Sequence, residues 1–202
     1  MTRIRKLIDH MSKALPNSTN ETAKRPTVFL DFDDVIAVNK YYGGYDVVSP
    51  GPKPADLYLR LFHPPAGALL VRVIEAYRPA VVITTSWLRF FERDGMHELL
   101  NKTGLGAVAF HLHDAWEAPP ERLMSRRGQV DKWFTTHHRG ESYVVLDDKS
   151  SGTELLNSPH DKAGRVVWCE ERVGLHEGHW SQISSALTMP WQPVNRSERG
   201  KR

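Results

Sequence analysis

The chain has 202 residues, of which 40% are hydrophobic and 25% are charged. This balance is typical of a globular protein and excludes a chain that is disordered throughout. No stretch approaches the roughly 20 consecutive apolar residues of a membrane span. A single cysteine, Cys169, excludes an internal disulfide framework and a multi-cysteine zinc site. We therefore expect a soluble, cytoplasmic protein with one main domain and no membrane partner.

The formal net charge is 27 − 24 = +3, which is only mildly basic. Nucleic-acid-binding proteins usually gather Lys and Arg on one face, whereas here the basic residues concentrate at the two ends of the chain. Net charge alone therefore does not predict nucleic-acid binding.

The two ends differ from the middle of the chain. Apolar residues at helical spacing over residues 2–15 predict a short amphipathic helix, followed by a polar linker, so residues 1–25 form an N-terminal appendage. Residues 189–202 are rich in Pro, Arg and Ser and are expected to form a flexible basic tail. Residues 26–188 remain as the main, catalytic domain.

Short apolar runs alternate with helical patterns through the middle of the chain. We predict strands over residues 27–30, 80–83, 107–110, 143–146 and 165–168, and helices over residues 69–77, 90–102, 129–136 and 180–187. Runs that are apolar throughout are typical of strands buried on both faces of a parallel sheet. The expected fold class is α/β: a three-layer sandwich around a mainly parallel, Rossmann-like sheet of about five strands.

Two acidic pairs follow predicted strands. Asp31 and Asp33 come after the first strand, and Asp147 and Asp148 follow the fourth. The carboxyl ends of parallel strands meet at one edge of a sheet, where ligands bind. Carboxylates brought this close repel one another unless a cation lies among them. Oxygen ligands favour Mg²⁺ over zinc, so the four aspartates are candidate metal ligands.

Two further segments have the chemistry to bind phosphate. Thr84 and Thr85 follow the second strand and offer hydroxyl and backbone N–H groups. Arg127, just before the next predicted helix, is a cation that can neutralise a phosphoryl group, and Lys132 is the rival for this role.

The order of these motifs resembles the haloacid dehalogenase (HAD)-type phosphohydrolase superfamily. The first motif is Val28-Phe-Leu-Asp31-Phe-Asp33-Asp34-Val35, the second ends at Thr84, the third is Arg127 and the fourth ends at Asp147-Asp148. Details of the sequence are similar to small, nearly capless members, including the HAD domains of RNA-repair proteins. Two positions depart from the pattern: Asp34 replaces the usual Gly, and Arg127 replaces the usual Lys.

The resemblance implies roles for these residues. Asp31 would attack phosphorus and form an aspartyl-phosphate, and Asp33 would act as general acid and base. Thr84 and Arg127 would hold the phosphoryl oxygens. Asp31, Asp147 or Asp148 and the backbone carbonyl of Asp33 would hold Mg²⁺.

The expected function is that of a Mg²⁺-dependent phosphomonoester hydrolase acting on a nucleotide or another phosphorylated metabolite. A Gly- and Pro-rich segment at about residues 41–63 predicts a small flap instead of a full cap domain. Such an open site also fits the alternative substrate, a nucleic-acid end. A phospho-accepting signalling module and a catalytically silent binding domain are further alternatives, and the sequence leaves the oligomeric state open.

Overall fold

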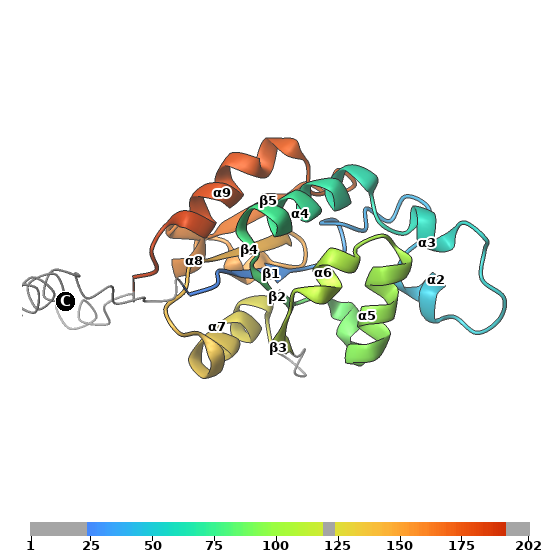
Figure 1. The fold of residues 1–202 in the computed structure, drawn as a ribbon, viewed down its shortest axis with the longest axis horizontal. Coiled ribbons are helices and arrows are strands. Elements are labelled where there is room, and N and C mark those ends of the chain that lie inside the picture. Colours follow the sequence, from blue (N-terminus) through green and yellow to red (C-terminus); the bar gives the residue numbers. More distant parts are fainter. Residues whose placement is uncertain (1–23, 119–123, 193–202) are drawn as a thin grey trace, which may run out of the picture.

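A computed structural model describes residues 24–118 and 124–192 (Figure 1). The strands are β1 (Thr27–Leu30), β2 (Ala80–Ile83), β3 (Leu112–Glu117), β4 (Tyr143–Asp148) and β5 (Val166–Cys169). The α-helices are α2 (Gly44–Val48), α3 (Leu57–Arg60), α4 (Pro64–Tyr77), α5 (Arg93–Lys102), α6 (Gly106–Phe110), α7 (Arg126–His137), α8 (Pro159–Lys162) and α9 (Trp180–Thr188). The helix expected over residues 2–15 and most of the predicted tail lie outside the described residues.

The five strands form one parallel sheet in the order β3-β2-β1-β4-β5. This confirms the predicted α/β class with a Rossmann-like parallel sheet. β1 is central, and Leu30 at its end is level with Ile83 of β2 and with Leu146 of β4. β1 and β2 therefore end at the same level at one edge of the sheet, and β4 continues past it by two residues, Asp147 and Asp148.

Alternate residues of the central strands enter two separate cores. Val28 and Leu30 pack with α4, α5, α6 and α9, whereas Phe29 packs with Val130 and Trp133 of α7. This alternation follows from the period of two in a strand. By the same alternation, the residue that follows the end of a central strand, such as Asp31 after Leu30, faces α7 again.

Helix α7 begins at a defined cap. The Ser125 hydroxyl accepts a hydrogen bond from the backbone N–H of Gly128 at 3.2 Å, which satisfies one of the free donors of the first helical turn. Arg126 is consequently the first helical residue. It shares a buried face with Val130 and Trp133, four and seven positions further along.

The third predicted strand is wrong. Residues 107–110 belong to α6, whose Val108 and Ala109 are buried against the core. The strand itself is Leu112–Glu117, at the edge of the sheet, and only its Leu112 and Trp116 are buried. An edge strand with this mixed burial lacks the continuous apolar run that identified the interior strands.

The segment expected to form a flap, residues 41–63, contains the short helices α2 and α3 at one end of the molecule (Figure 1). Leu57, Leu61 and Phe62 anchor it in the core. The backbone N–H of His63 donates to the carbonyl oxygen of Ile36 at 2.7 Å and closes the segment at its base. No helix of residues 24–118 and 124–192 is long and apolar enough to cross a membrane.

Candidate active site

The sheet register brings the predicted site residues to one level. The backbone N–H of Asp31 donates to Leu146 at 3.1 Å, and that of Thr84 donates to Leu30 at 2.9 Å. Asp31, Thr84 and Asp147 are therefore the next residues along three neighbouring strands. Asp31 meets Asp147 and Asp148, far away in the sequence, because β1 and β4 are adjacent in the sheet.

Three carboxylates form the centre of the site. Asp31, Asp147 and Asp148 each offer an oxygen atom, and these atoms lie within 4.8 Å of one another. All three side chains are almost fully buried, with exposed fractions of 1%, 0% and 1%. Several buried carboxylates at this spacing need a cation to offset their repulsion.

One such cation is the guanidinium of Arg126. It lies 3.1 Å from Asp31 Oδ1 through its Nη2 atom and 2.9 Å from Asp147 Oδ2 through its Nε atom. The Nε contact has the distance of an ion pair but not the angle of a hydrogen bond. Arg126 is itself buried and bridges Asp31 at the end of β1 and Asp147 in β4.

The structure assigns this place to a different arginine from the one predicted. The side chain of Arg127 is 41% exposed and forms an ion pair with Asp131 at 3.3 Å, one turn along α7. Lys132 is exposed on the same helix. Because α7 begins at Arg126, its neighbour Arg127 points about 100° away from the carboxylates. Neither predicted cation is the buried one.

The carboxylate oxygens fit a divalent cation. Asp147 Oδ1 accepts from the N–H of Asp148, and Asp148 Oδ1 accepts from Ser150 and Ser151. Both oxygens of Asp31, Oδ2 of Asp147 and Oδ2 of Asp148 are buried without a hydrogen-bond partner. Arg126 lies against Asp31 Oδ1 and Asp147 Oδ2, which leaves Asp31 Oδ2 and Asp148 Oδ2 for a metal ion. A buried oxygen atom without a hydrogen-bond partner lowers the stability of the folded protein. A set of ligands made only of oxygen atoms suits Mg²⁺. The best-fitting pair is therefore Asp31 and Asp148.

Burial controls the protonation of these acids. Desolvation raises the pKa of Asp31 to about 6, although Arg126 lowers it. Desolvation likewise raises the pKa of Asp147 well above its usual range, again opposed by Arg126. In the metal-free protein the cluster therefore holds protons at a pH where exposed aspartates are ionised.

These raised pKa values predict that Mg²⁺ stabilises the folded protein more at high pH than at low pH. The folded pKa values of Asp31 and Asp147 lie above their unfolded values. The contribution of Asp31 to the stability of the metal-free protein is therefore full below about pH 4 and is lost as the pH rises through about 6. Mg²⁺ binds the ionised carboxylates. Excess Mg²⁺ should raise Tm by roughly 5–10 °C at pH 8 and by much less at pH 5, measured by differential scanning fluorimetry against EDTA.

Two variants test whether this shift belongs to the cluster. Asp148→Asn should lose most of the shift at pH 8. Asp34→Asn should keep it, because the Asp34 side chain accepts a hydrogen bond from the backbone of Arg172 and is not one of the three clustered carboxylates. Equal shifts at both pH values would contradict the assignment.

The side chain of Asp33 is not part of the three-carboxylate cluster. Its Oδ2 accepts from the indole N–H of Trp87 at 2.9 Å, and its Oδ1 accepts from the amide of Asn39 at 3.2 Å. The Asp33 carboxylate therefore lies apart from the three clustered acids, and metal binding by the Asp33 residue stays a prediction. These two donors fix the carboxylate, and sequence reasoning missed both of them in this role.

The two threonines of the second motif differ in their surroundings. Thr84 is completely buried, and its hydroxyl has no hydrogen-bond partner. Thr85 instead caps the short 3-10 helix Ser86–Arg89, since its hydroxyl accepts from the N–H of Trp87 at 3.4 Å. Thr84 is therefore the hydroxyl that remains available to a phosphoryl oxygen.

A parallel α/β sheet with acidic pairs at the carboxyl ends of two adjacent strands, a threonine after a third and a cation on the helix that precedes β4 defines a HAD-type hydrolase fold. The chain matches the family model described as the HAD domain in Swiss Army Knife RNA repair proteins over residues 27–180. It belongs to this family, which confirms the resemblance seen in the sequence. Comparisons with curated proteins and with solved structures found no match.

Membership places the chain in a superfamily of hydrolases and phosphatases whose members generally use Mg²⁺. The buried acidic cluster stands where such a metal site is expected. The family match covers β1 to the start of α9, and thus every residue of the candidate site.

Proposed function

We propose that the protein is a Mg²⁺-dependent phosphomonoester hydrolase that acts through an aspartyl-phosphate on Asp31. The single observation that carries this proposal is the buried group of Asp31, Asp147 and Asp148 together with Arg126. The cytoplasmic location and the division into residues 1–25, 26–188 and 189–202, predicted from the sequence, belong to the same proposal.

The chain supplies the reacting groups. An ionised Asp31 oxygen forms a bond to phosphorus while the bond to the leaving oxygen breaks, and Asp33 gives that oxygen a proton. A water molecule then attacks phosphorus, Asp33 takes a proton from it, and the bond between Asp31 and phosphorus breaks. The indole of Trp87 and the amide of Asn39 orient Asp33 in both steps.

Thr84 and Arg126 are placed to hold the non-bridging oxygens of the phosphoryl group. A buried guanidinium and a buried hydroxyl stabilise the charge that develops in a dry site better than they would in water. Asp31 and Asp148, with the backbone carbonyl of Asp33, would hold Mg²⁺, which screens the charge of the incoming dianion.

The family match favours a phosphorylated RNA end over the nucleotide or small metabolite that the sequence placed first. In the part of the chain that the structure describes, the segment over residues 41–63 forms only two short helices, α2 and α3. A segment this small leaves room beside the site for the end of a polymer.

A substrate panel tests the activity and the substrate class together. Phosphate release would be measured on mononucleotides, sugar phosphates and RNA oligonucleotides with a 3′- or 5′-phosphate, each with Mg²⁺ and with EDTA. We expect multiple turnovers that require Mg²⁺, with the highest kcat/KM on an oligonucleotide. A stoichiometric phosphorylation without turnover would instead identify a phospho-accepting module.

A further inference from the structure

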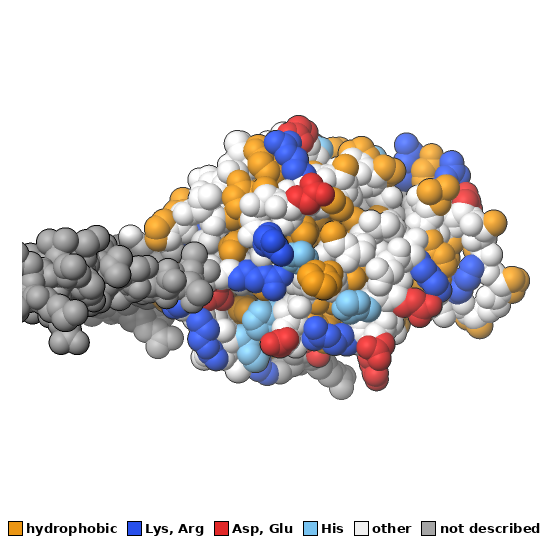
Figure 2. All heavy atoms as spheres, viewed as in Figure 1, with side chains coloured by type: hydrophobic (Ala, Val, Ile, Leu, Met, Phe, Trp, Pro, Cys, Tyr) orange, Lys and Arg blue, Asp and Glu red, His pale blue; other side chains and the backbone are white. Residues whose placement is uncertain are grey.

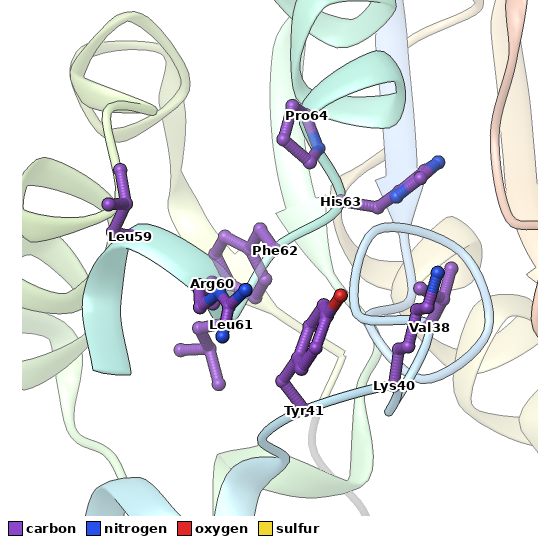
Figure 3. Close-up of a pocket in the computed structure, with 9 residues that line it drawn as sticks. All are labelled: Val38, Lys40, Tyr41, Leu59, Arg60, Leu61, Phe62, His63 and Pro64. Atoms are coloured by element: carbon purple, nitrogen blue, oxygen red, sulfur yellow. The ribbon is translucent and has the colours of Figure 1, made fainter. Parts of the chain in front are cut away.

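A pocket with a volume of about 150 Å³ lies between the loop after β1 and the chain that links α3 to α4 (Figure 3). An apolar cavity of about this size accommodates a benzene ring, so the pocket has room for one aromatic ring. It is lined by Val38, Lys40, Tyr41, Leu59, Arg60, Leu61, Phe62, His63 and Pro64. The lining is apolar apart from basic groups and one tyrosine.

Both sides of the pocket connect to the proposed acid–base residue, Asp33. On one side, Asn39 lies between two lining residues in the sequence and donates to Asp33 Oδ1. On the other side, Phe62 stacks on Trp87, with ring centroids 6.1 Å apart, and Trp87 donates to Asp33 Oδ2. Residues that line the pocket, or are next to lining residues in the sequence, are therefore linked by these contacts to the Asp33 carboxylate.

The pocket carries a fixed pair of a cation and an aromatic ring. The guanidinium carbon of Arg60 lies 4.1 Å from the centroid of the Tyr41 ring. Asp56 holds this arginine at 3.3 Å and also accepts a hydrogen bond from Tyr42 at 2.6 Å. The ammonium of Lys40 approaches the same Tyr41 ring at 5.7 Å. Two positive charges therefore flank a ring that stays 54% exposed.

An exposed ring beside cations is the combination that binds single-stranded nucleic acid. Aromatic rings and guanidinium planes stack on bases, and the cations attract the backbone phosphates. At the end of the molecule that carries α2 and α3, Figure 2 shows hydrophobic and basic side chains next to one another on the surface.

We propose that this pocket binds a base of an RNA strand near its terminal phosphate. Tyr41 provides the stacking surface, and Arg60 and Lys40 face the phosphates of the strand. The terminal phosphate lies at Asp31, so this inference rests on the proposed phosphatase function. The inference identifies this pocket as the part of the protein that distinguishes an RNA strand from a small phosphate ester.

Binding of single-stranded RNA tests the pocket without requiring catalysis. A fluorescein-labelled RNA decamer with a terminal phosphate would be titrated with the full chain in EDTA, and the anisotropy recorded. We expect Tyr41→Ala and Arg60→Ala each to raise Kd about tenfold. Tyr41→Phe keeps the ring and should bind within about twofold of the unchanged protein.

Arg72→Ala is the matched control. Arg72 also stacks on an aromatic ring, Trp180, and pairs with an acid, Glu177, but it lies on α4 facing α9 instead of in the pocket. Its loss removes the same charge and the same kind of contact. Arg72→Ala should leave the Kd for RNA unchanged. If Arg72→Ala raises Kd as much as Arg60→Ala does, the effect of Arg60 is one of net charge and the proposal is overturned.

Kinetics separate this inference from the proposed function. The ratio of kcat/KM for the phosphorylated oligonucleotide to kcat/KM for p-nitrophenyl phosphate should fall about tenfold in Tyr41→Ala. If Tyr41→Ala is an active enzyme with an unchanged Kd for RNA and an unchanged kcat/KM ratio, RNA binding by the pocket is refuted and the proposed function is not. RNA binding that depends on Tyr41 in a protein without phosphatase activity would refute the proposed function alone. No measurable RNA binding by the unchanged protein would also refute the pocket.

Discussion

Replacing Asp31 with asparagine should abolish phosphate release while leaving the fold intact. Asparagine has nearly the same shape but is neutral and a much weaker nucleophile, so no aspartyl-phosphate can form. Loss of a nucleophile of this kind lowers kcat by at least about a thousandfold. Because Asp31 is buried among other acids, a neutral side chain also removes repulsion. Phosphate release and Tm would be measured on the same preparations.

A neighbouring aspartate gives the control for this experiment. The Asp34 side chain accepts a hydrogen bond from the N–H of Arg172 at 2.8 Å, and its φ of 53° is one that asparagine tolerates. Asp34→Asn should retain activity within about twofold. Turnover in Asp31→Asn comparable to that of the control would show that another group attacks phosphorus.

Removing Arg126 should lower kcat/KM by about a hundredfold or more. A buried donor aimed at developing negative charge contributes 10²–10³ in rate in comparable sites. Arg126 also offsets the charge of Asp31 and Asp147. Arg126→Ala therefore leaves these buried acids uncompensated and is expected to raise their pKa values further. The pH–rate profile of Arg126→Ala should be displaced to higher pH, and its maximum rate should be lower.

Arg127→Ala is the matched control, one position away. Arg127 is partly exposed and forms an ion pair with Asp131, a kind of contact that contributes at most about 1 kcal/mol at a surface. Its loss should change kcat/KM by less than about twofold. If Arg126→Ala does not fold, Arg126→Lys keeps a positive charge at this position. Full activity in a folded Arg126→Ala protein would contradict the assigned role.

The interior of the sheet could be predicted from the sequence because its strands are uniformly apolar. Thr27–Leu30 and Ala80–Ile83 lie where the short apolar runs indicated, and each is buried along its whole length. The meeting of the two acidic pairs followed from parallel strands with a shared carboxyl edge. A strand that is buried on both faces is apolar along its whole length, and this continuous apolar run can be recognised in the sequence.

The choice between Arg126 and Arg127 could also have been made from the sequence. Arg126, Val130 and Trp133 have the spacing of one helical face, and the two apolar residues mark that face as buried. Arg127 shares its face with Asp131, a polar partner four residues on. The expected start of the helix at residue 129 concealed this pattern, since it left both arginines in a loop.

The rim of the site could not be predicted in the same way. The pocket depends on the stacking of Arg60 on Tyr41, two residues in separate elements without a shared periodicity. The same holds for Trp87 and Asn39, which converge on Asp33 from different loops. Contacts of this kind arise from the path of irregular chain, for which hydrophobic patterning carries no signal.

The hydrogen bond between His63 and Ile36 has a consequence for how this protein could be altered. It closes residues 37–62 at their base beside the sheet, so Asp31 and Asp33 should keep their place when the chain is changed beyond Asn39, which binds Asp33. Doubling the length of such a closed loop costs only about 0.6 kcal/mol. Chimeras that carry a foreign insert between these anchors should therefore remain competent catalysts and acquire the selectivity of the donor.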